Sequence, residues 1–288
     1  MINLEAYTDF ASVYDTFMDD TPYEAWADFL AELIEKYGIS KPERDKSESG
    51  PGACGRDEIL NSERNLVLDL GCGTGTLTEL LYKKGYDMIG VDNSQEMLNI
   101  ALAKKEKSGS EILYLCQDMR ELDLYSTIGT VISVCDSVNY LLEDDEVAET
   151  FSLVNNYLYP GGLFIFDFNT VYKYEQVIGD TTIAENRENC SFIWENYYHE
   201  EECINEYDLT IFAREEGSEY FRRFAETHFQ RGYTVEEMTG FVEQAGMEVA
   251  LVLDADTHKA PSPESERIYV IAREVMKVRE GQDLGLRD

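Results

Sequence analysis

The chain has 288 residues, 43% of them hydrophobic, and its 24 basic and 58 acidic residues give a formal charge of −34. This length suits one large domain, or one domain with a sizeable insertion, and the hydrophobic content is unlike that of disordered chains. The acidic balance disfavours a nucleic-acid partner, because phosphate binding relies on Lys and Arg. No apolar run approaches 18 residues and no signal-peptide pattern is visible, so no membrane span is expected.

Residues 1–40 predict a helical cap. Aromatic side chains recur between positions 7 and 18. A second helix follows, because Thr21-Pro22-Tyr23-Glu24 reads as a capping box with Pro at the first helical position. Residues 41–62 predict a polar linker, since Ser, Gly and Pro are concentrated there.

From residue 63 onward, apolar strand-like runs alternate with helical patterns, which argues for a doubly wound, mostly parallel sheet with helices on both faces. The predicted strands span residues 65–70, 86–91, 111–116, 129–135, 162–168, 247–254 and 267–273. The predicted helices span residues 75–84, 94–107 and 143–158, the last ended by Pro160-Gly161-Gly162, and another begins at Thr234. We expect seven strands, one of them antiparallel, from residues 63–187 and 232–276.

Residues 188–231 interrupt this alternation. Three β-like segments appear at 191–199, 204–214 and 220–231, with a turn between the last two. We therefore expect an antiparallel β insertion after the fifth strand, placed as a lid on the main domain.

Three glycines at alternate positions follow the first predicted strand directly. Gly71, Gly73 and Gly75 allow a sharp turn and a close approach to a ligand, and the helix after them offers unpaired N–H groups. Asp69 precedes the glycines, and Asp92 ends the second strand, where a ribose-hydroxyl acceptor is expected. The spacing is G-x-G-x-G rather than the dinucleotide pattern G-x-G-x-x-G, which counts against a dehydrogenase.

Three segments together resemble the class I S-adenosylmethionine-dependent methyltransferase family: Val67 to Gly75, Val91 to Ser94 and Gln117 to Met119. The resemblance implies a Rossmann-like methyltransferase fold, S-adenosylmethionine as cofactor and S-adenosylhomocysteine as product. It implies that the glycine loop cradles the methionine part, that the strand-two acid binds the ribose, and that the acid after strand three reaches the adenine. The cofactor-binding residues it implies are Tyr14, Asp69, Gly71, Cys72, Gly73, Gly75, Asp92, Asn93, Met97, Asp118, Met119 and Asp136.

Some of these assignments have a plainer alternative. Tyr14 resembles the tyrosine that closes over the cofactor in members with a helical cap, and Asp136 is placed to accept from the methionine amino group. Met97 packs either on the adenine or in the core, and Cys72 is read more simply as a small packing residue.

The substrate side rests on fewer signals. After strand four, Asn139 and Tyr140 either face the substrate or cap and pack under the next helix. His228 shares one face of its predicted strand with Glu226, and is either a general base or a structurally bonded histidine. Arg267 either binds an acidic substrate group or pairs with a neighbouring Glu.

These residues predict an enzyme that transfers a methyl group by in-line displacement to a small-molecule acceptor. The alternatives are a protein or RNA methyltransferase, and a cofactor-binding protein without turnover. No metal is expected, because the six cysteines show no ligand spacing, and reduced thiols indicate a cytoplasmic protein. The acceptor atom and the oligomeric state are not indicated by the sequence.

Overall fold

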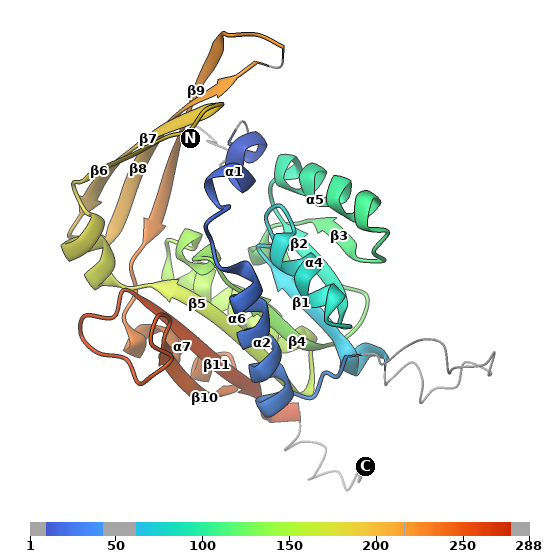
Figure 1. Ribbon diagram of the computed structural model, residues 1–288. Coiled ribbons are helices and arrows are strands. Elements are labelled where there is room, and N and C mark those ends of the chain that lie inside the picture. Colours follow the sequence, from blue (N-terminus) through green and yellow to red (C-terminus); the bar gives the residue numbers. More distant parts are fainter. Residues whose placement is uncertain (1–9, 43–61, 216, 278–288) are drawn as a thin grey trace, which may run out of the picture.

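The computed structural model describes residues 10–42, 62–215 and 217–277, which form two sheets with flanking helices (Figure 1). The larger sheet has seven strands in the order β10-β11-β5-β4-β1-β2-β3. Strand β11 runs antiparallel to both β5 and β10, and the other neighbouring pairs of this sheet are parallel. The strands are β1 (Leu66–Leu70), β2 (Asp87–Asp92), β3 (Leu113–Cys116), β4 (Ile128–Ser133), β5 (Leu158–Asn169), β10 (Met247–Asp254) and β11 (Arg267–Glu274). The predicted fold class is therefore confirmed.

Helices cover both faces of this sheet. The flanking helices are α2 (Tyr23–Tyr37), α4 (Thr76–Lys83), α5 (Gln95–Ser108), α6 (Asp144–Tyr157) and α7 (Val235–Gln244). One core joins α2 and α4 to the sheet through residues such as Leu30, Ile34 and Leu81. The other core joins α6 and α7 to the opposite face through Phe151 and Val242. Apolar burial on both faces explains why the central strands read as continuous apolar runs.

Strand β5 is longer than predicted. It begins at Leu158, directly after α6, and not at residue 162. The Pro160-Gly161-Gly162 sequence was interpreted as a break between helix and strand. Leu158 nevertheless pairs with Ile128 of β4. The register then shifts, so that Thr130 pairs with Leu163, and this irregularity accommodates the extra residues of β5.

The smaller sheet is the inserted one and has four antiparallel strands. They are β6 (Thr182–Asn186), β7 (Cys190–His199), β8 (Ile204–Arg214) and β9 (Phe221–Arg231). Strand β6 was not predicted, and it extends the insertion beyond its expected start at residue 188. Its sequence, TIAEN, carries only one large apolar side chain, so its period-two signal is weak.

Of the two N-terminal helices, α2 packs on one face of the larger sheet beside α4, and α1 (Ala11–Phe17) packs on the smaller sheet. Helix α1 packs there with Val13 against Tyr207 and Ile211, and it lies beside α5 (Figure 1). The predicted capping box at Thr21 is wrong. The N-cap residue of α2 is Pro22, without a side-chain cap, because Thr21 closes a turn onto Met18 instead. Most of the predicted linker lies outside the described residues.

Candidate functional site

A cavity of about 740 Å³ opens at the carboxyl ends of strands β1 to β4. Its walls come from the glycine loop, from the segments after β2, β3 and β4, and from two tyrosines of the N-terminal helices, Tyr14 and Tyr23. Of the residues predicted to bind the cofactor, ten line it: Tyr14, Asp69, Gly71, Cys72, Gly73, Asp92, Asn93, Met97, Asp118 and Met119. A cavity at this edge is where open α/β sheets bind their ligands.

The glycine loop combines tight packing with an open approach. Gly73 and Gly75 have φ values of 53° and 71°, in the left-handed region that favours glycine. A Cβ on Gly75 would lie 2.4 Å from the hydroxyl of Tyr114, whereas a Cβ on Gly73 would meet no atom within 4 Å. Gly75 is therefore required by packing and does not line the cavity, while Gly73 leaves its backbone accessible to a ligand.

Asp92 holds the loop in place. Its Oδ2 accepts a hydrogen bond from the Gly73 N–H at 2.7 Å, and its Oδ1 accepts one from the Ser94 N–H at 2.9 Å. Burial raises the pKa of this carboxyl, while the backbone hydrogen bonds oppose that shift. Each carboxylate oxygen keeps a further lone pair, so Asp92 can also accept hydrogen bonds from ligand hydroxyls.

Asp69 is fully buried beneath the loop and accepts a hydrogen bond from the Thr78 hydroxyl at 2.6 Å. Burial raises the pKa of this carboxyl to about 7, although the Thr78 hydrogen bond partly offsets the shift. Burial therefore favours the protonated form of Asp69 more than it is favoured in an exposed carboxyl group. A cationic group bound nearby would favour its ionised form.

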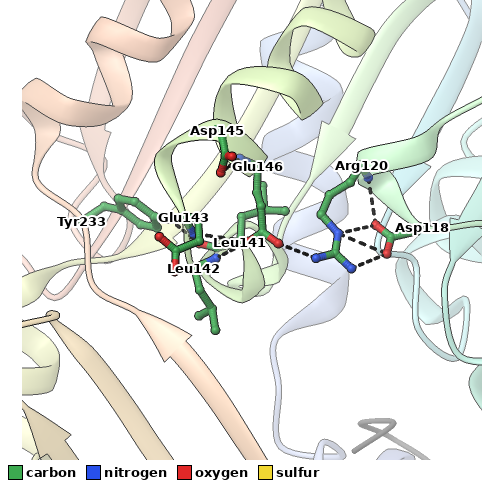
Figure 2. A network of polar contacts seen from close by, with 8 residues as sticks. All are labelled: Asp118, Arg120, Leu141, Leu142, Glu143, Asp145, Glu146 and Tyr233. Atoms are coloured by element: carbon green, nitrogen blue, oxygen red, sulfur yellow. Dashed lines mark hydrogen bonds and ion pairs between the residues drawn. The ribbon is translucent and has the colours of Figure 1, made fainter. Parts of the chain in front are cut away.

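At the opposite wall, Asp118 is fixed by Arg120, as Figure 2 shows. The Arg120 Nε lies 3.0 and 3.1 Å from the two carboxylate oxygens, and the same guanidinium donates to Glu146 at the start of α6. The hydrogen bond from Arg120 lowers the pKa of Asp118. This side chain therefore stays ionised and oriented at the cavity wall.

Helix α1 is tied to the glycine loop by polar contacts. The Asp15 carboxylate accepts a hydrogen bond from the Thr74 hydroxyl at 2.6 Å and pairs with Lys104 of α5 at 2.7 Å. The Lys104 ammonium group also donates to the hydroxyls of Thr74 and Thr76. These contacts hold Tyr14, the residue before Asp15, at the cavity wall.

The structure does not place Asp136 at the cavity wall, contrary to the predicted contact with the cofactor. Cys135 and Asp136 both have positive φ, and their N–H groups donate to the buried Asp167 carboxylate at 3.1 and 2.8 Å. In this turn the Asp136 side chain accepts hydrogen bonds from Gln230 at 2.8 Å and Asn169 at 3.2 Å. Asp136 therefore joins the main domain to strand β9.

Two other side chains considered for the substrate have structural partners. Asn139 is fully buried and donates to the backbone carbonyls of Asn169 and Arg231, so it does not face a substrate. Arg267 pairs with Asp167 at 3.0 Å, and its guanidinium lies 4.6 Å from the ring centre of Trp26. Arg267 is therefore paired with a carboxylate, but that carboxylate belongs to an aspartate and not to the expected glutamate.

Tyr140 and His228 are brought together from distant parts of the sequence. Tyr140 lies in the short 3-10 helix η2 (Ser137–Tyr140) and lines the cavity. Its hydroxyl is 3.1 Å from Nδ1 of His228, which is 2% exposed and does not line the cavity itself. A proton taken up by Tyr140 thus has a direct route to an imidazole.

Several cavity residues were missed by the sequence analysis, among them Tyr23, Cys116 and Arg120. Cys116 follows the rule that ligand contacts gather where parallel strands end, so its position carried a usable signal. Tyr23 was assigned only to a helix start. Arg120 gave no signal, because its partner Glu146 lies 26 residues away in the sequence.

Comparison with known proteins gives consistent results. A family model described as a methyltransferase domain matches residues 67–162. GWCH70_2453 of Geobacillus sp. (strain WCH70), which is named as a methyltransferase, is 34% identical over 93% of this chain and 99% of its own length.

Among solved structures, an S-adenosylmethionine-dependent methyltransferase from Clostridium acetobutylicum ATCC 824 superposes with a TM-score of 0.77 at 28% identity, covering 94% of this chain and 100% of its own. CalS10 from Micromonospora echinaspora, an amino pentose methyltransferase solved with S-adenosylmethionine bound, superposes with a TM-score of 0.65. At 17% identity over 94% of this chain and 98% of its own, CalS10 supports the fold alone.

Two further properties of the described residues concern metal binding and membrane-spanning helices. Within residues 10–42, 62–215 and 217–277, no three His, Cys, Asp or Glu side chains are grouped to hold a metal ion. Over the same part of the chain, no helix is long and apolar enough to cross a membrane.

Proposed function

The chain belongs to the class I S-adenosylmethionine-dependent methyltransferase family, and from this premise we propose that its methyl acceptor is a small molecule. The enzyme uses S-adenosylmethionine, whose sulfonium supplies an activated methyl group for in-line displacement. The protein's own task is then to hold the cofactor, to align the acceptor and to accept a proton where the acceptor carries one.

The residues around the cavity fit this cofactor. The open backbone at Gly73 and the buried Asp69 suit the methionine part, which carries charged groups. Asp92 suits the ribose hydroxyls, with Asn93 beside it, and Asp118 with Met97 and Met119 suits the adenine. Tyr14 would cover the bound cofactor from helix α1. Asp136 is not among these proposed cofactor-binding residues, because its carboxylate binds Gln230 and Asn169.

A small acceptor is favoured by the size and cover of the cavity. A volume of about 740 Å³ lies within the range of ligand pockets for small molecules, roughly 300–1,000 Å³. Tyr14, Tyr23 and the inserted sheet with α1 act as a lid in this proposal, which disfavours a bulky macromolecular substrate. The net charge of −34 disfavours RNA further. CalS10, which shares the fold, is an amino pentose methyltransferase.

Tyr140 and His228 are the proposed proton acceptors of the reaction. Tyr140 lines the cavity, and its hydroxyl contacts His228 at 3.1 Å. Histidine is suited to proton transfer near neutral pH. An acceptor that arrives without a proton would not need this pair. The cytoplasm is the proposed location, supported by five free cysteines among the described residues.

The observation that carries the cofactor assignment is the hydrogen bond from Gly73 N–H to Asp92 at the cavity wall. We would titrate the protein calorimetrically with S-adenosylmethionine and S-adenosylhomocysteine, using Asp92→Ala as the test variant. Hydrogen bonds to charged groups contribute about 1.5–3 kcal/mol each, so affinity should fall about tenfold or more. Asp87→Ala, at the exposed start of the same strand, should bind normally.

Once binding is established, a panel of amines, hydroxy compounds and amino sugars would be screened for methyl transfer. Methylation of small molecules supports the proposal. Binding of neither cofactor form by the folded protein would contradict the cofactor assignment, and methylation confined to proteins or RNA would contradict the small-molecule acceptor.

A further inference from the structure

Three side chains form a line that starts at the cavity wall and ends inside the lid. The Tyr140 hydroxyl is 3.1 Å from His228 Nδ1, and His228 Nε2 is 3.3 Å from Glu226 Oε2, a distance that allows electrostatic attraction although the contact lacks the angular geometry of a hydrogen bond. His228 and Glu226 are only 2% and 8% exposed. Their separation by two residues on β9 places both on the same face of the strand.

Tyr207 of the neighbouring strand β8 fixes the plane of the imidazole. It lies opposite His228 in the strand register, and the two rings stack at 4.8 Å with an angle of 5° between their planes. The Tyr207 hydroxyl lies 2.7 Å from that of Tyr140. With the ring plane fixed in this way, Nδ1 faces the Tyr140 hydroxyl and Nε2 faces the Glu226 carboxylate.

Glu226 is itself held at both oxygens. Its Oε1 accepts a hydrogen bond at 2.9 Å from the backbone N–H of Phe10, the residue that precedes helix α1. Its Oε2 is the oxygen that faces His228. The N-terminal cap therefore contributes directly to the orientation of this carboxylate.

We propose that Glu226 is a positioning residue that keeps His228 protonated at Nε2 and free to accept a proton at Nδ1, so that Tyr140, His228 and Glu226 form a proton relay. This inference rests on the proposed function, because the relay needs a methyl acceptor at Tyr140. A neutral imidazole has one donor and one acceptor nitrogen. The negative charge of a carboxylate 3.3 Å from Nε2 favours the tautomer with the N–H at Nε2.

The proton then has a defined path. As the methyl carbon leaves the cofactor sulfur and bonds to the acceptor, the acceptor's proton passes to the Tyr140 oxygen, and the Tyr140 proton passes to His228 Nδ1. The products are the methylated acceptor, a neutral thioether and an imidazolium ion. The positive charge lost from the sulfonium is thus carried by His228, and the ionised Glu226 stabilises it.

The tautomer can be tested without knowing the acceptor. Wild-type protein labelled with ¹⁵N at its three histidines would be measured by NMR with S-adenosylhomocysteine present, and His228→Gln would assign the signals. We expect His228 to be protonated at Nε2 and not at Nδ1. Glu226→Gln should shift its nitrogen signals and reduce this preference, and Tyr140→Phe should shift Nδ1 through loss of the hydroxyl donor.

The chain contains a matched control. Glu206 lies 2.9 Å from His199 on the same sheet, and both side chains are solvent-exposed to a substantial degree. Glu206→Gln should therefore alter only the signals of His199. With an acceptor from the screen, Glu226→Gln should lower kcat by about 100-fold or more with little change in S-adenosylhomocysteine affinity, whereas Glu206→Gln should retain full turnover.

The relay would be overturned if His228 carries its proton at Nδ1, or if Glu226→Gln leaves the His228 signals or kcat unchanged. These outcomes differ from failure of the proposed function, which would appear as absence of cofactor binding in the wild type. The NMR measurement decides on the pairing in either case, because it reports on the histidine directly.

Discussion

The Asp15 carboxylate and the Lys104 ammonium group lie 2.7 Å apart and join helix α1 to helix α5 across the glycine loop. Both side chains are partly exposed, at 39% and 29%. Because exposed pairs of this kind contribute little to stability, this contact alone would hold helix α1 over the glycine loop only weakly.

Lys104→Met should loosen this cover. Exposed pairs contribute roughly 0–1 kcal/mol, so we expect the Kd for S-adenosylhomocysteine to rise about two- to fivefold, mainly through faster dissociation. Stopped-flow release of the ligand would measure this. Added salt should weaken binding less in the variant than in the wild type, because screening acts on the pair itself. Lys107→Met, on the exposed end of the same helix, is the control.

The glycine loop gives a second test, in which strain and ligand access can be separated. Gly73 and Gly109 have φ values of 53° and 72°, and a Cβ on either would meet no atom within 4 Å. Each substitution by Ala should cost roughly 1–2 kcal/mol of stability from the left-handed backbone. Only Gly73 lines the cavity, so only Gly73→Ala should weaken cofactor binding, by about tenfold or more. Equal affinities in the two variants would contradict a ligand at this loop.

Local capping signals in the sequence were reliable only where no other contact competed. Ser94 caps α5 by accepting from the Met97 N–H, and Thr234, where a helix was predicted to begin, forms a capping box at the start of α7. Thr21 carries the same kind of signal, but the turn from Met18 engages it first, so the cap is not formed. A capping pattern shows that a residue is able to cap a helix, but the preceding turn determines whether the cap forms.

The cofactor side of the site was largely predictable, because its residues follow directly from strand ends. Asp69 and Asp92 sit at fixed places relative to β1 and β2. The proton relay was not predictable as a unit. His228 and Tyr140 are 88 residues apart, and Glu226 reaches Phe10 across 216 residues. Such contacts depend on how the inserted sheet folds back, which periodicity within one strand does not specify.

Asp69 predicts a pH-dependent stability. Burial raises its pKa in the folded protein to about 7, whereas in the unfolded chain it lies near 3.9. Between these values the folded protein keeps a proton that the unfolded chain loses, so this group's contribution to stability falls as pH rises through that window. The total loss is at most roughly 4 kcal/mol.

Asp69→Asn should remove that loss, since the amide resembles the protonated acid. Urea unfolding should give similar stabilities for the variant and the wild type near pH 4, and a more stable variant at pH 8. Asp87 is an exposed acid on β2, so the stability difference between Asp87→Asn and the wild type should not grow between pH 4 and pH 8. A constant difference between Asp69→Asn and the wild type across this range would contradict the raised pKa.

The contact from Phe10 to Glu226 predicts that the backbone of the N-terminal segment tunes the relay. Phe10 has a φ of −63°, which proline adopts without strain, so Phe10→Pro removes the N–H while keeping this angle. Both Phe10→Pro and Phe10→Ala lose the ring that packs on the inserted sheet. Their difference therefore isolates the hydrogen bond.

Hydrogen bonds to charged groups contribute about 1.5–3 kcal/mol, so kcat should be about tenfold lower in Phe10→Pro than in Phe10→Ala. The His228 nitrogen signals should shift in the proline variant only, with equal S-adenosylhomocysteine affinity in both. Identical kcat values and signals would mean that the cap covers the cavity without orienting Glu226.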